Sequence, residues 1–405
     1  MQYLKTSIIA NFLLLTICGN LFSQQQEPKS TVAKNVTVIE LNGNGYQRGL
    51  EHGKLLKTEI AEVYKKWKDD IAKDSGQDAD SIIHKFYRST YFEPAIKKWT
   101  PEIYDEVKGI AESSGQSFKD VYCFQLVDEF WVYLDELSNK ENHHCSGIGV
   151  GATKNSPAYI AQNLDIESFR NGYQVLLHVA ANKAEPEQYI LSCAGLIALN
   201  GVNSKSIGLT LNTLMQLKAS TDGLPVSYII RGVLAKNDAQ SAISFLKTIK
   251  HASGQNYILG AVDKVYDFEA SANKVERYIP DASNPSLVYH TNHPIKNNDV
   301  KPWYAENLKK VLSGENKDNN SLVRFLAVQS RMNTNATSQT ADRIKATLRS
   351  KDNEESPVCK TYDETKSGFT FSSVLFTLGK KPSIQLTNGS PDQSEYVLHS
   401  FHSIK

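Results

Sequence analysis

Cys145 opens the segment of this sequence in which residue types and spacing are best suited to chemistry. The segment reads CSGIGVGATKNSPAYIAQNLDIE, and its turn signal KNSP (154–157) lies midway between Cys145 and Asp165. A hairpin that pairs symmetrically about Asn155 would place Asp165 directly opposite Cys145. The period of two along a strand would place Asn163 on the same face. The pattern predicts a carboxylate beside the backbone nitrogen of a cysteine.

Such a cysteine could act as a nucleophile without a partner histidine. A thiol needs a base, and a cysteine that becomes the first residue of a chain carries its own, an α-amine with a pKa of about 8. Asp165 would orient this amine, and preorganised amide donors would complete an oxyanion hole. The chemistry that we expect is attack of the thiol on a carbonyl group.

Two other uses of the cysteine are open. In a Cys–His pair of the papain type, His290 or His293 would activate the thiol. No CGSCW-like sequence is present, however, and papain-like enzymes place the nucleophile at a helix N-terminus. A zinc site would add His143 and His144 to the same two histidines, but these spacings fit no compact metal motif. We therefore expect neither a metal nor a cofactor.

The elements that must position these residues change character at Cys145. A short strand at 36–41 precedes a region with apolar residues at helical spacing, which runs to about residue 135 and ends in the polar SNKENHH. After Cys145 the period falls to two, with successive strands and hairpin turns, one of them at 263–264. Further helices are expected at 226–235, 238–249, 303–312, 320–330 and 339–349. Strand runs framed by helical runs predict an α+β fold of antiparallel sheets covered by helices.

Composition limits the possible partners. The 405 residues are 40% hydrophobic and 22% charged, which is typical of a globular chain, and no linker or repeat divides them. The formal net charge is +1, from 45 basic and 44 acidic side chains, so nucleic acid is not an expected partner. Three cysteines besides Cys145 follow the signal region and are expected to be packing residues: Cys123, Cys193 and Cys359.

The N-terminus has the layout of a secretory signal peptide. Lys5 precedes an apolar stretch at 7–22, and the polar QQQEPKS follows Ser23. We expect an exported, periplasmic or secreted protein whose mature chain starts near Gln24. An uncleaved membrane anchor is the alternative, but polar residues and glycine interrupt a run already short for spanning. Lipidation at Cys18 is also open.

Several segments resemble one known family. The stretch that begins at Cys145 is similar to the start of the mature chain in the acyl-coenzyme A:isopenicillin N acyltransferase-like cysteine peptidases. It resembles more loosely the choloylglycine hydrolases, which belong to the same N-terminal-nucleophile superfamily. The segments GYQRGLEHG (45–53), SGQNYILGAVDKVYDFEAS (253–271), YHTNH (289–293) and the region 357–391 follow in the family's order. Together these segments cover most of residues 40–390.

The resemblance implies a role for four residues, and the strand period adds Asn163 as a fifth candidate. Cys145 falls on the nucleophile and Asp165 on the aspartate that holds the new amine. Asn292 falls on the asparagine whose side chain helps to form the oxyanion hole. Asn212 matches a second asparagine near the acyl pocket, and Asn163 is a further candidate for oxyanion or substrate binding.

The resemblance also implies a four-layer αββα sandwich made as one precursor. The precursor would cut itself between His144 and Cys145. With separate removal of a 1–23 signal peptide, the products would be a mostly helical 24–144 propeptide chain and a 145–405 catalytic chain. The propeptide chain would be a partner after cleavage. The expected substrate is a small molecule with a linear amide, or N-acyl, bond, and hydrolysis and acyl transfer are both open. Bile salt hydrolases have an arginine where this chain has Gln162, which argues against bile salts.

A second hypothesis is a non-catalytic exported binding protein on the same fold. Such a protein would have no reason to hold Cys145, Asp165 and Asn292 within hydrogen-bonding reach of one another, so their convergence distinguishes the two hypotheses.

Two pairs of charged or titratable residues have no assigned chemistry. Arg48 and His52 are expected to be solvated or capping groups. Arg231 and Glu269 could form an internal ion pair or contact the substrate.

Overall fold

The computed structural model describes residues 36–138, 144–306, 320–333 and 339–401, all within one compact unit, 35–405. The expected signal peptide at 1–23, with Cys18 and Gln24, lies outside the described residues, as does His143. None of the described helices combines the length and the apolar character needed to span a bilayer.

The first sheet has eight strands in the order β1-β4-β5-β6-β7-β8-β9-β10. Every neighbouring pair is antiparallel except β1 and β4, which run parallel. A parallel pair needs a crossover connection, and here that connection contains the whole N-terminal helical region. The strands are β1 (Thr37–Leu41), β4 (Gln174–Val179), β5 (Gln188–Cys193), β6 (Asn200–Asn203), β7 (Gly208–Thr213), β8 (Gln255–Gly260), β9 (Val265–Ala270) and β10 (Val275–Tyr278).

The second sheet has six strands in the order β11-β2-β3-β12-β13-β14. All five residues of β2 are buried because both faces of this strand are covered. Its glycines let the two sheets approach closely: a Cβ on Gly147 would lie 2.9 Å from Ile258 and 3.0 Å from the side-chain oxygen of Asn212. The strands are β2 (Ser146–Val150), β3 (Tyr159–Glu167), β11 (Leu287–His290), β12 (Gly368–Thr377), β13 (Ser383–Leu386) and β14 (Val397–Ser400).

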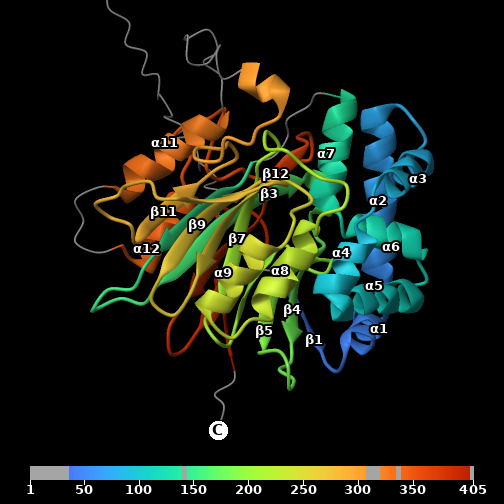
Figure 1. Cartoon of the computed structure of the whole chain (residues 1–405), viewed down its shortest axis with the longest axis horizontal. Coiled ribbons are helices and arrows are strands. Elements are labelled where there is room, and N and C mark those ends of the chain that lie inside the picture. The colour runs from blue at the N-terminus through green and yellow to red at the C-terminus, as the bar shows by residue number, and fades with distance from the viewer. Residues whose placement is uncertain (1–35, 139–143, 307–319, 334–338, 402–405) are drawn as a thin grey trace, which may run out of the picture. The chain divides into compact units, whose positions relative to one another are not determined.

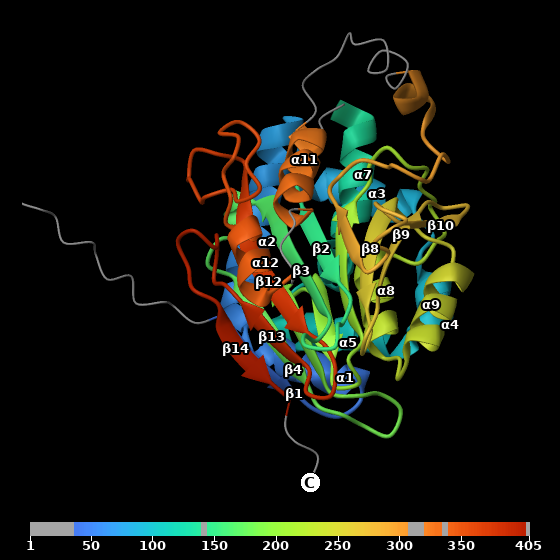
Figure 2. The same ribbon diagram turned by 90° about the vertical axis from the view of Figure 1, so that its left-hand side faces the viewer.

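Two pairs of helices cover the outer faces of the stacked sheets. Helices α8 (Val226–Leu234) and α9 (Ala239–Thr248) lie on the eight-stranded sheet. Helices α11 (Asn320–Met332) and α12 (Ala341–Leu348) lie on the six-stranded sheet and enclose a smaller second core. Figures 1 and 2 show the resulting four layers, which confirm the predicted αββα sandwich.

The N-terminal helices gather beside the sandwich (Figure 1). Glycines explain how closely α1 packs on α5: a Cβ on Gly49 would lie 2.0 Å from the carbonyl oxygen of Glu106, and one on Gly45 would lie 1.8 Å from that of Glu102. The spacing of four residues places these glycines on one face of α1. The helices are α1 (Gly45–Leu55), α2 (Lys57–Ser75), α3 (Ala79–Ser89), α4 (Glu93–Trp99), α5 (Pro101–Ser114), α6 (Phe118–Phe124) and α7 (Val127–Ser138).

The expectation that Arg48 and His52 are solvated or capping groups is wrong, because both lie in the buried contact that the glycines create. Arg48 Nε donates to Glu106 at 2.9 Å, and Arg231 of α8 donates two hydrogen bonds to the same carboxylate at 2.6 and 2.8 Å. His52 accepts a hydrogen bond from the backbone nitrogen of Gly195, and burial lowers its pKa to about 4. Arg231 therefore pairs with Glu106 and not with Glu269.

Most predicted elements are confirmed, including the 36–41 strand, the 263–264 turn and the helices at 226–235, 238–249, 320–330 and 339–349. The helix expected at 303–312 is seen at 302–306 and otherwise falls outside the described residues. Strand β14 was not expected, because VLHS lies among turn-prone residues and alternates only weakly.

Candidate active site

The hairpin of β2 and β3 starts the candidate site, and its predicted register is wrong by one residue. Ser146 pairs with Asn163, so the same register extended by one residue places Cys145 opposite Leu164. The turn explains the difference: Thr153 N donates to Ser156 O at 2.9 Å, which centres a two-residue turn between positions 154 and 155.

Cys145, Asp165 and Asn292 nevertheless come together. The Cys145 backbone nitrogen donates to Asn292 Oδ1 at 2.6 Å, and its thiol lies 4.0 Å from the backbone oxygen of Asp165. The Asp165 carboxylate accepts a hydrogen bond of 2.7 Å from Thr370 Oγ1 on the neighbouring strand β12. A β-bulge between Thr370 and Ser372 shifts the pairing at this point, as bulges beside functional sites often do.

The Asn292 amide has a defined orientation. Its Oδ1 faces the Cys145 nitrogen, and its Nδ2 donates to the backbone oxygen of Thr213 at 3.1 Å. A side-chain amide has two N–H donors, and among the described residues the second makes no hydrogen bond. That donor is available for the oxyanion role that the sequence predicts.

Arg324, from α11, is a site residue that the sequence analysis missed. It is fully buried, and its guanidinium donates to Cys145 O at 2.5 Å, to Ser146 Oγ at 3.1 Å and to Asn292 Oδ1 at 3.0 Å. Burial lowers its pKa to about 10, so it stays charged at neutral pH. A signal existed: Arg324 shares the apolar face of α11 with Val328 and Met332, four and eight residues later.

The same helix also holds the residue before the cysteine. His144 Nδ1 donates to Asn320 Oδ1 at 2.7 Å, and Arg324 Nε donates to the same oxygen at 2.7 Å. Asn320 thus fixes His144, while Arg324 fixes Cys145. Both sides of the His144–Cys145 peptide bond are anchored to the first two turns of α11.

Burial sets the protonation of the central groups. Burial, with a smaller contribution from the charge of Asp165, raises the pKa of the Cys145 thiol to about 12, so the thiol is protonated in this uncut chain. Burial also raises the pKa of Asp165 to about 6, against the opposing effects of Lys360, Thr370 and Arg324. At neutral pH the site therefore combines a neutral thiol with a largely ionised carboxylate.

Cys145 and Asp165 line a pocket that is apolar on most of its surface. Helices α7 and α8 close it, with Asp128 and Trp131 contributed by α7. Eight aliphatic side chains supply most of the wall: Val127, Leu164, Ile166, Ala198, Leu199, Leu211, Val226 and Ile230.

The sequence model of the family described as acyl-coenzyme A:6-aminopenicillanic acid acyl-transferase matches residues 152–393, more than half of the 405 residues. The chain belongs to this family. The match includes Asp165, Asn212, Asn292 and Arg324, and it begins after Cys145. No curated protein matches the chain.

Three solved structures show similarity at low identity. The Caenorhabditis elegans ortholog of N-acylethanolamine-hydrolyzing acid amidase is 14% identical over 57% of this chain and 92% of its own, with a TM-score of 0.39. A mutant of conjugated bile acid hydrolase from Clostridium perfringens is 14% identical over 63% and 96%, with a TM-score of 0.41. Penicillin V acylase from Agrobacterium tumefaciens is 13% identical over 60% and 82%, with a TM-score of 0.36. The family model alone carries the assignment to the acyl-transferase family.

The other two asparagines that the sequence analysis proposed for the site, Asn212 and Asn163, lie in different places. Asn212 Nδ2 donates to His290 O at 3.1 Å, and its Oδ1, beside Gly147, has no partner among the described residues. Asn163 instead donates to the backbone oxygens of Leu348 and Val358, at 2.7 and 2.9 Å, and is not among the residues that line the pocket. Asn163 therefore ties β3 to the end of α12.

Gln162, the departure from bile salt hydrolases, connects the two sheets. Its Oε1 accepts a hydrogen bond of 2.9 Å from Asn200 of β6, and its Nε2 donates to the backbone oxygen of Leu211. The side chain is fully buried, so it acts in sheet packing at this position.

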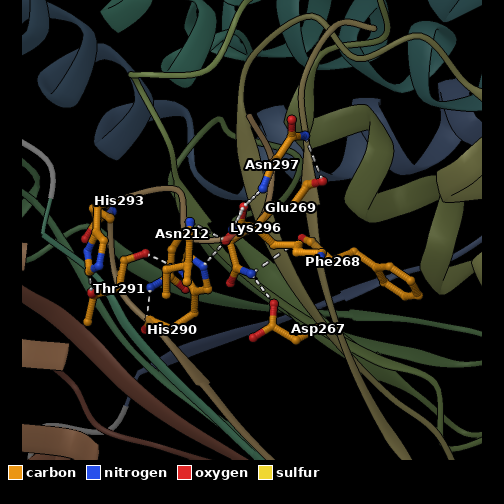
Figure 3. Close-up of polar contacts among 12 residues, drawn as sticks. Asn212, Asp267, Phe268, Glu269, His290, Thr291, His293, Lys296 and Asn297 are labelled. Atoms are coloured by element: carbon orange, nitrogen blue, oxygen red, sulfur yellow. Dashed lines mark hydrogen bonds and ion pairs between the residues drawn. The ribbon is translucent and has the colours of Figure 1, made fainter. Parts of the chain in front are cut away.

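The histidines of the papain-type alternative are bonded elsewhere. His290 donates to Glu269 at 2.9 Å and is 2.7 Å from Thr291 O, while His293 bonds Ser321 at 2.8 Å. Figure 3 shows Glu269 at the centre of this network. Glu269 also accepts hydrogen bonds from the backbone nitrogens at 295–297, which fixes the loop that carries Asn292. Neither imidazole contacts the Cys145 thiol, so the dyad that a papain-type peptidase needs is not formed.

A metal site is equally unsupported by the geometry. Among the described residues, which exclude His143, no group of three or more His, Cys, Asp or Glu side chains is placed to hold a metal ion.

Proposed function

We propose that this chain is a self-processing enzyme with an N-terminal cysteine nucleophile, which hydrolyses or exchanges a linear amide bond through a thioester. The observation that carries the proposal is the arrangement of Asn292, Arg324 and Asp165 around both the thiol and the backbone nitrogen of Cys145. Membership of the acyl-transferase family supports the same reaction class. A binding protein would not need these contacts to the backbone nitrogen.

Self-cleavage would begin at the peptide bond that α11 anchors on both sides. The Cys145 sulfur attacks the His144 carbonyl carbon, the C–N bond breaks, and the Cys145 nitrogen takes the thiol proton and leaves as an amine. Water then hydrolyses the thioester, which frees the thiol and leaves a carboxylate on His144. Arg324 and Asn320 keep the two residues aligned throughout, and such positioning contributes strongly to rate.

The new amine would supply the base that the buried thiol lacks. Its pKa of about 8 allows it to take the thiol proton near neutrality. Asn292 Oδ1 already accepts a hydrogen bond from this nitrogen and would orient the amine, together with the charge of Asp165. The thiolate then attacks the substrate carbonyl, and the second N–H of Asn292 Nδ2 donates to the oxyanion. The amide C–N bond breaks, the substrate amine leaves with the proton that the Cys145 amine had taken, and water or another amine resolves the thioester.

The substrate would be a small N-acyl compound, and the acyl group would enter the mainly apolar pocket beside Cys145. We further propose export through a signal peptide at 1–23, with the 24–144 chain retained as a partner after cleavage. Coenzyme A is scarce outside the cytoplasm, so export favours hydrolysis over transfer from a coenzyme A thioester.

The deciding experiment is intact mass with N-terminal sequencing of the purified protein. We expect two chains, one beginning at Cys145, and a single uncut chain for Cys145→Ala. Cys359→Ala is the matched control, because this cysteine is also fully buried but bonds Asp392 outside the pocket. If wild type and Cys145→Ala both remain single chains, the self-processing mechanism is wrong.

A further inference from the structure

Asp128 places a carboxylate from the N-terminal segment in the wall of the Cys145 pocket. It lies on α7, is only 6% exposed, and lines the pocket together with the cysteine. Its Oδ1 accepts hydrogen bonds from Thr213 Oγ1 and, at 3.0 Å, from Gln255 Nε2. Its Oδ2 makes no hydrogen bond among the described residues. Oδ1 thus fixes the side chain, and Oδ2 can accept a hydrogen bond from a ligand.

The next residue, Glu129, is a second buried carboxyl group, and it does not itself line the pocket. Glu129 Oε1 accepts from Ser253 Oγ at 2.6 Å and from Val226 N at 3.1 Å, and its Oε2 is buried without a partner among the described residues. Within the described residues no lysine or arginine pairs with either carboxyl group. Burial raises the pKa of Asp128. Burial, with a smaller contribution from the charge of Asp128, raises the pKa of Glu129 to about 8, so Glu129 is mostly protonated at neutral pH. Asp128 is therefore the carboxyl group of this pair that faces the pocket, and a carboxylate there without a counter-ion favours a cationic partner.

The two hydroxyl groups in the pocket wall already donate to acceptors other than Asp128 Oδ2. The Thr213 hydroxyl already donates to Asp128 Oδ1, and the Ser227 hydroxyl donates to the backbone oxygen of Gln125. Most of the remaining wall is aliphatic. A group that donates a hydrogen bond to Asp128 Oδ2 is therefore favoured over one that leaves it without a partner.

Thr213 also connects Asp128 to the nucleophile. Its hydroxyl donates to Asp128, its backbone oxygen accepts from Asn292 Nδ2, and Asn292 Oδ1 accepts from Cys145 N. The free oxygen of Asp128 is therefore held in a fixed relation to the reacting thiol, as a specificity group must be.

We infer that Asp128 is a specificity-determining residue that binds an ammonium group on the acyl part of the substrate. This inference rests on the proposed function. The acyl part is assigned because the pocket is enclosed, with 13 of its 14 lining residues buried. The acyl group stays on sulfur as the thioester, while the amine must leave. The N-terminal segment then contributes a specificity residue to the mature enzyme.

The test uses matched amides of one fluorogenic amine, 7-amino-4-methylcoumarin. Propanoyl, alanyl and β-alanyl derivatives differ in whether an ammonium is present and on which carbon, and a 2-hydroxypropanoyl derivative offers a neutral donor. We expect wild type to prefer one of the two ammonium substrates over propanoyl by about 10- to 100-fold in kcat/KM, the range for a hydrogen bond to a charged group. If the 2-hydroxypropanoyl derivative has the same kcat/KM as the preferred ammonium substrate, the assignment to an ammonium group is wrong.

Two variants complete the test. Asp128→Asn keeps the oxygen that accepts from Thr213 and Gln255, and we expect it to reduce the preference to within about threefold. Glu129→Gln is the matched control, because Glu129 does not line the pocket, and it should retain the preference. A preference that survives Asp128→Asn overturns the inference. If Asp128→Asn fails to self-cleave, the comparison of substrates with wild type still tests whether the enzyme prefers an ammonium group.

The failure of the inference is distinguishable from the failure of the proposed function. If wild type cleaves propanoyl and ammonium substrates at equal rates, the amidase activity stands and the inference is wrong. If processed wild type cleaves none of the four derivatives and no N-acyl amide with a longer chain, the proposed activity itself is wrong.

Discussion

At the scale of single residues, one guanidinium organises the candidate site. Arg324 donates to the Cys145 carbonyl, to Asn292 and to Asn320, and each of these three acceptors positions a different part of the reaction centre. The planar fork of arginine provides several donors in fixed directions, which the single ammonium of lysine cannot reproduce.

Arg324→Lys is therefore expected to slow self-cleavage by about 100-fold, the loss that misplacement of reacting groups can cause. The measurement is the time course of uncut chain by mass spectrometry after synthesis. Arg331→Lys is the control, since this arginine lies on the same helix but forms an exposed pair with Asp352. Equal rates for Arg324→Lys and wild type would contradict the role assigned to the guanidinium.

The sequence could identify part of this site and not the rest. Cys145 and Asp165 belong to one hairpin, so local spacing brings them close even though the predicted register is off by one. Arg324 reaches Cys145 from a helix distant in the chain, and Asp128 reaches the pocket from α7, the helix before Cys145. No periodicity within one helix specifies which distant strand that helix will cover, so these contacts required the tertiary structure.

At the scale of elements, the close contact between α1 and α5 depends on glycines, which have no side chain. A Cβ on Gly49 would lie 2.0 Å from Glu106 O, and one on Gly109 would lie 2.4 Å from Tyr46 O. This close approach carries Arg48 into contact with Glu106, where Arg231 of α8 meets the same carboxylate. The glycine spacing of GYQRGLEHG therefore has a packing explanation.

Gly49→Ala is expected to lower the free energy of unfolding by about 1–3 kcal/mol, because the methyl group overpacks a backbone contact. Gly368→Ala is the control, since its Cβ would meet nothing nearer than 3.3 Å. Chemical denaturation of both variants is the measurement. A loss in Gly49→Ala no greater than in the control would show that the two helices can separate at little cost.

The buried triad of Arg48, Glu106 and Arg231 gives a pH-dependent prediction. Burial alone would raise the pKa of Glu106, but the two guanidinium groups lower it to about 2. A carboxyl whose folded pKa lies below its unfolded value of 4.5 stabilises the fold above pH 4.5, and this contribution is lost as pH falls towards 2.

Glu106→Gln should therefore destabilise the protein by about 3–5 kcal/mol at pH 7, because it leaves two buried cations without a partner. The difference from wild type should shrink between pH 4.5 and 2, as followed by thermal unfolding across this range. Glu112→Gln, on an exposed part of α5, is the control. A difference that does not change with pH would exclude the ionisation of Glu106 as its cause.

At the scale of the whole molecule, the N-terminal segment is part of the sandwich. Strand β1 forms the edge of the eight-stranded sheet by parallel pairing with β4, and α7 closes the Cys145 pocket. Sequence pattern predicted the strand and the layers, because hydrophobic period reports element type. It did not predict the parallel pairing, which depends on where a long crossover through seven helices returns.

This embedding predicts that the two chains stay together after cleavage. Processed protein is expected to elute from a sizing column as one species that contains both chains, and to separate only in denaturant. Native mass spectrometry of the processed wild type, beside uncut Cys145→Ala, is the measurement. Recovery of a folded 145–405 chain alone would contradict the structural role of β1 and α7.

The position of α7 also bears on how the substrate range of such an enzyme can diverge. Val127, Asp128 and Trp131 face the pocket but precede the nucleophile in the chain. Random variation at these three codons can therefore retune acyl selectivity while the machinery around Cys145 stays intact. Related enzymes with the same catalytic side chains can therefore differ in substrate range through changes in α7. A sequence comparison limited to the 145–405 chain would miss these changes.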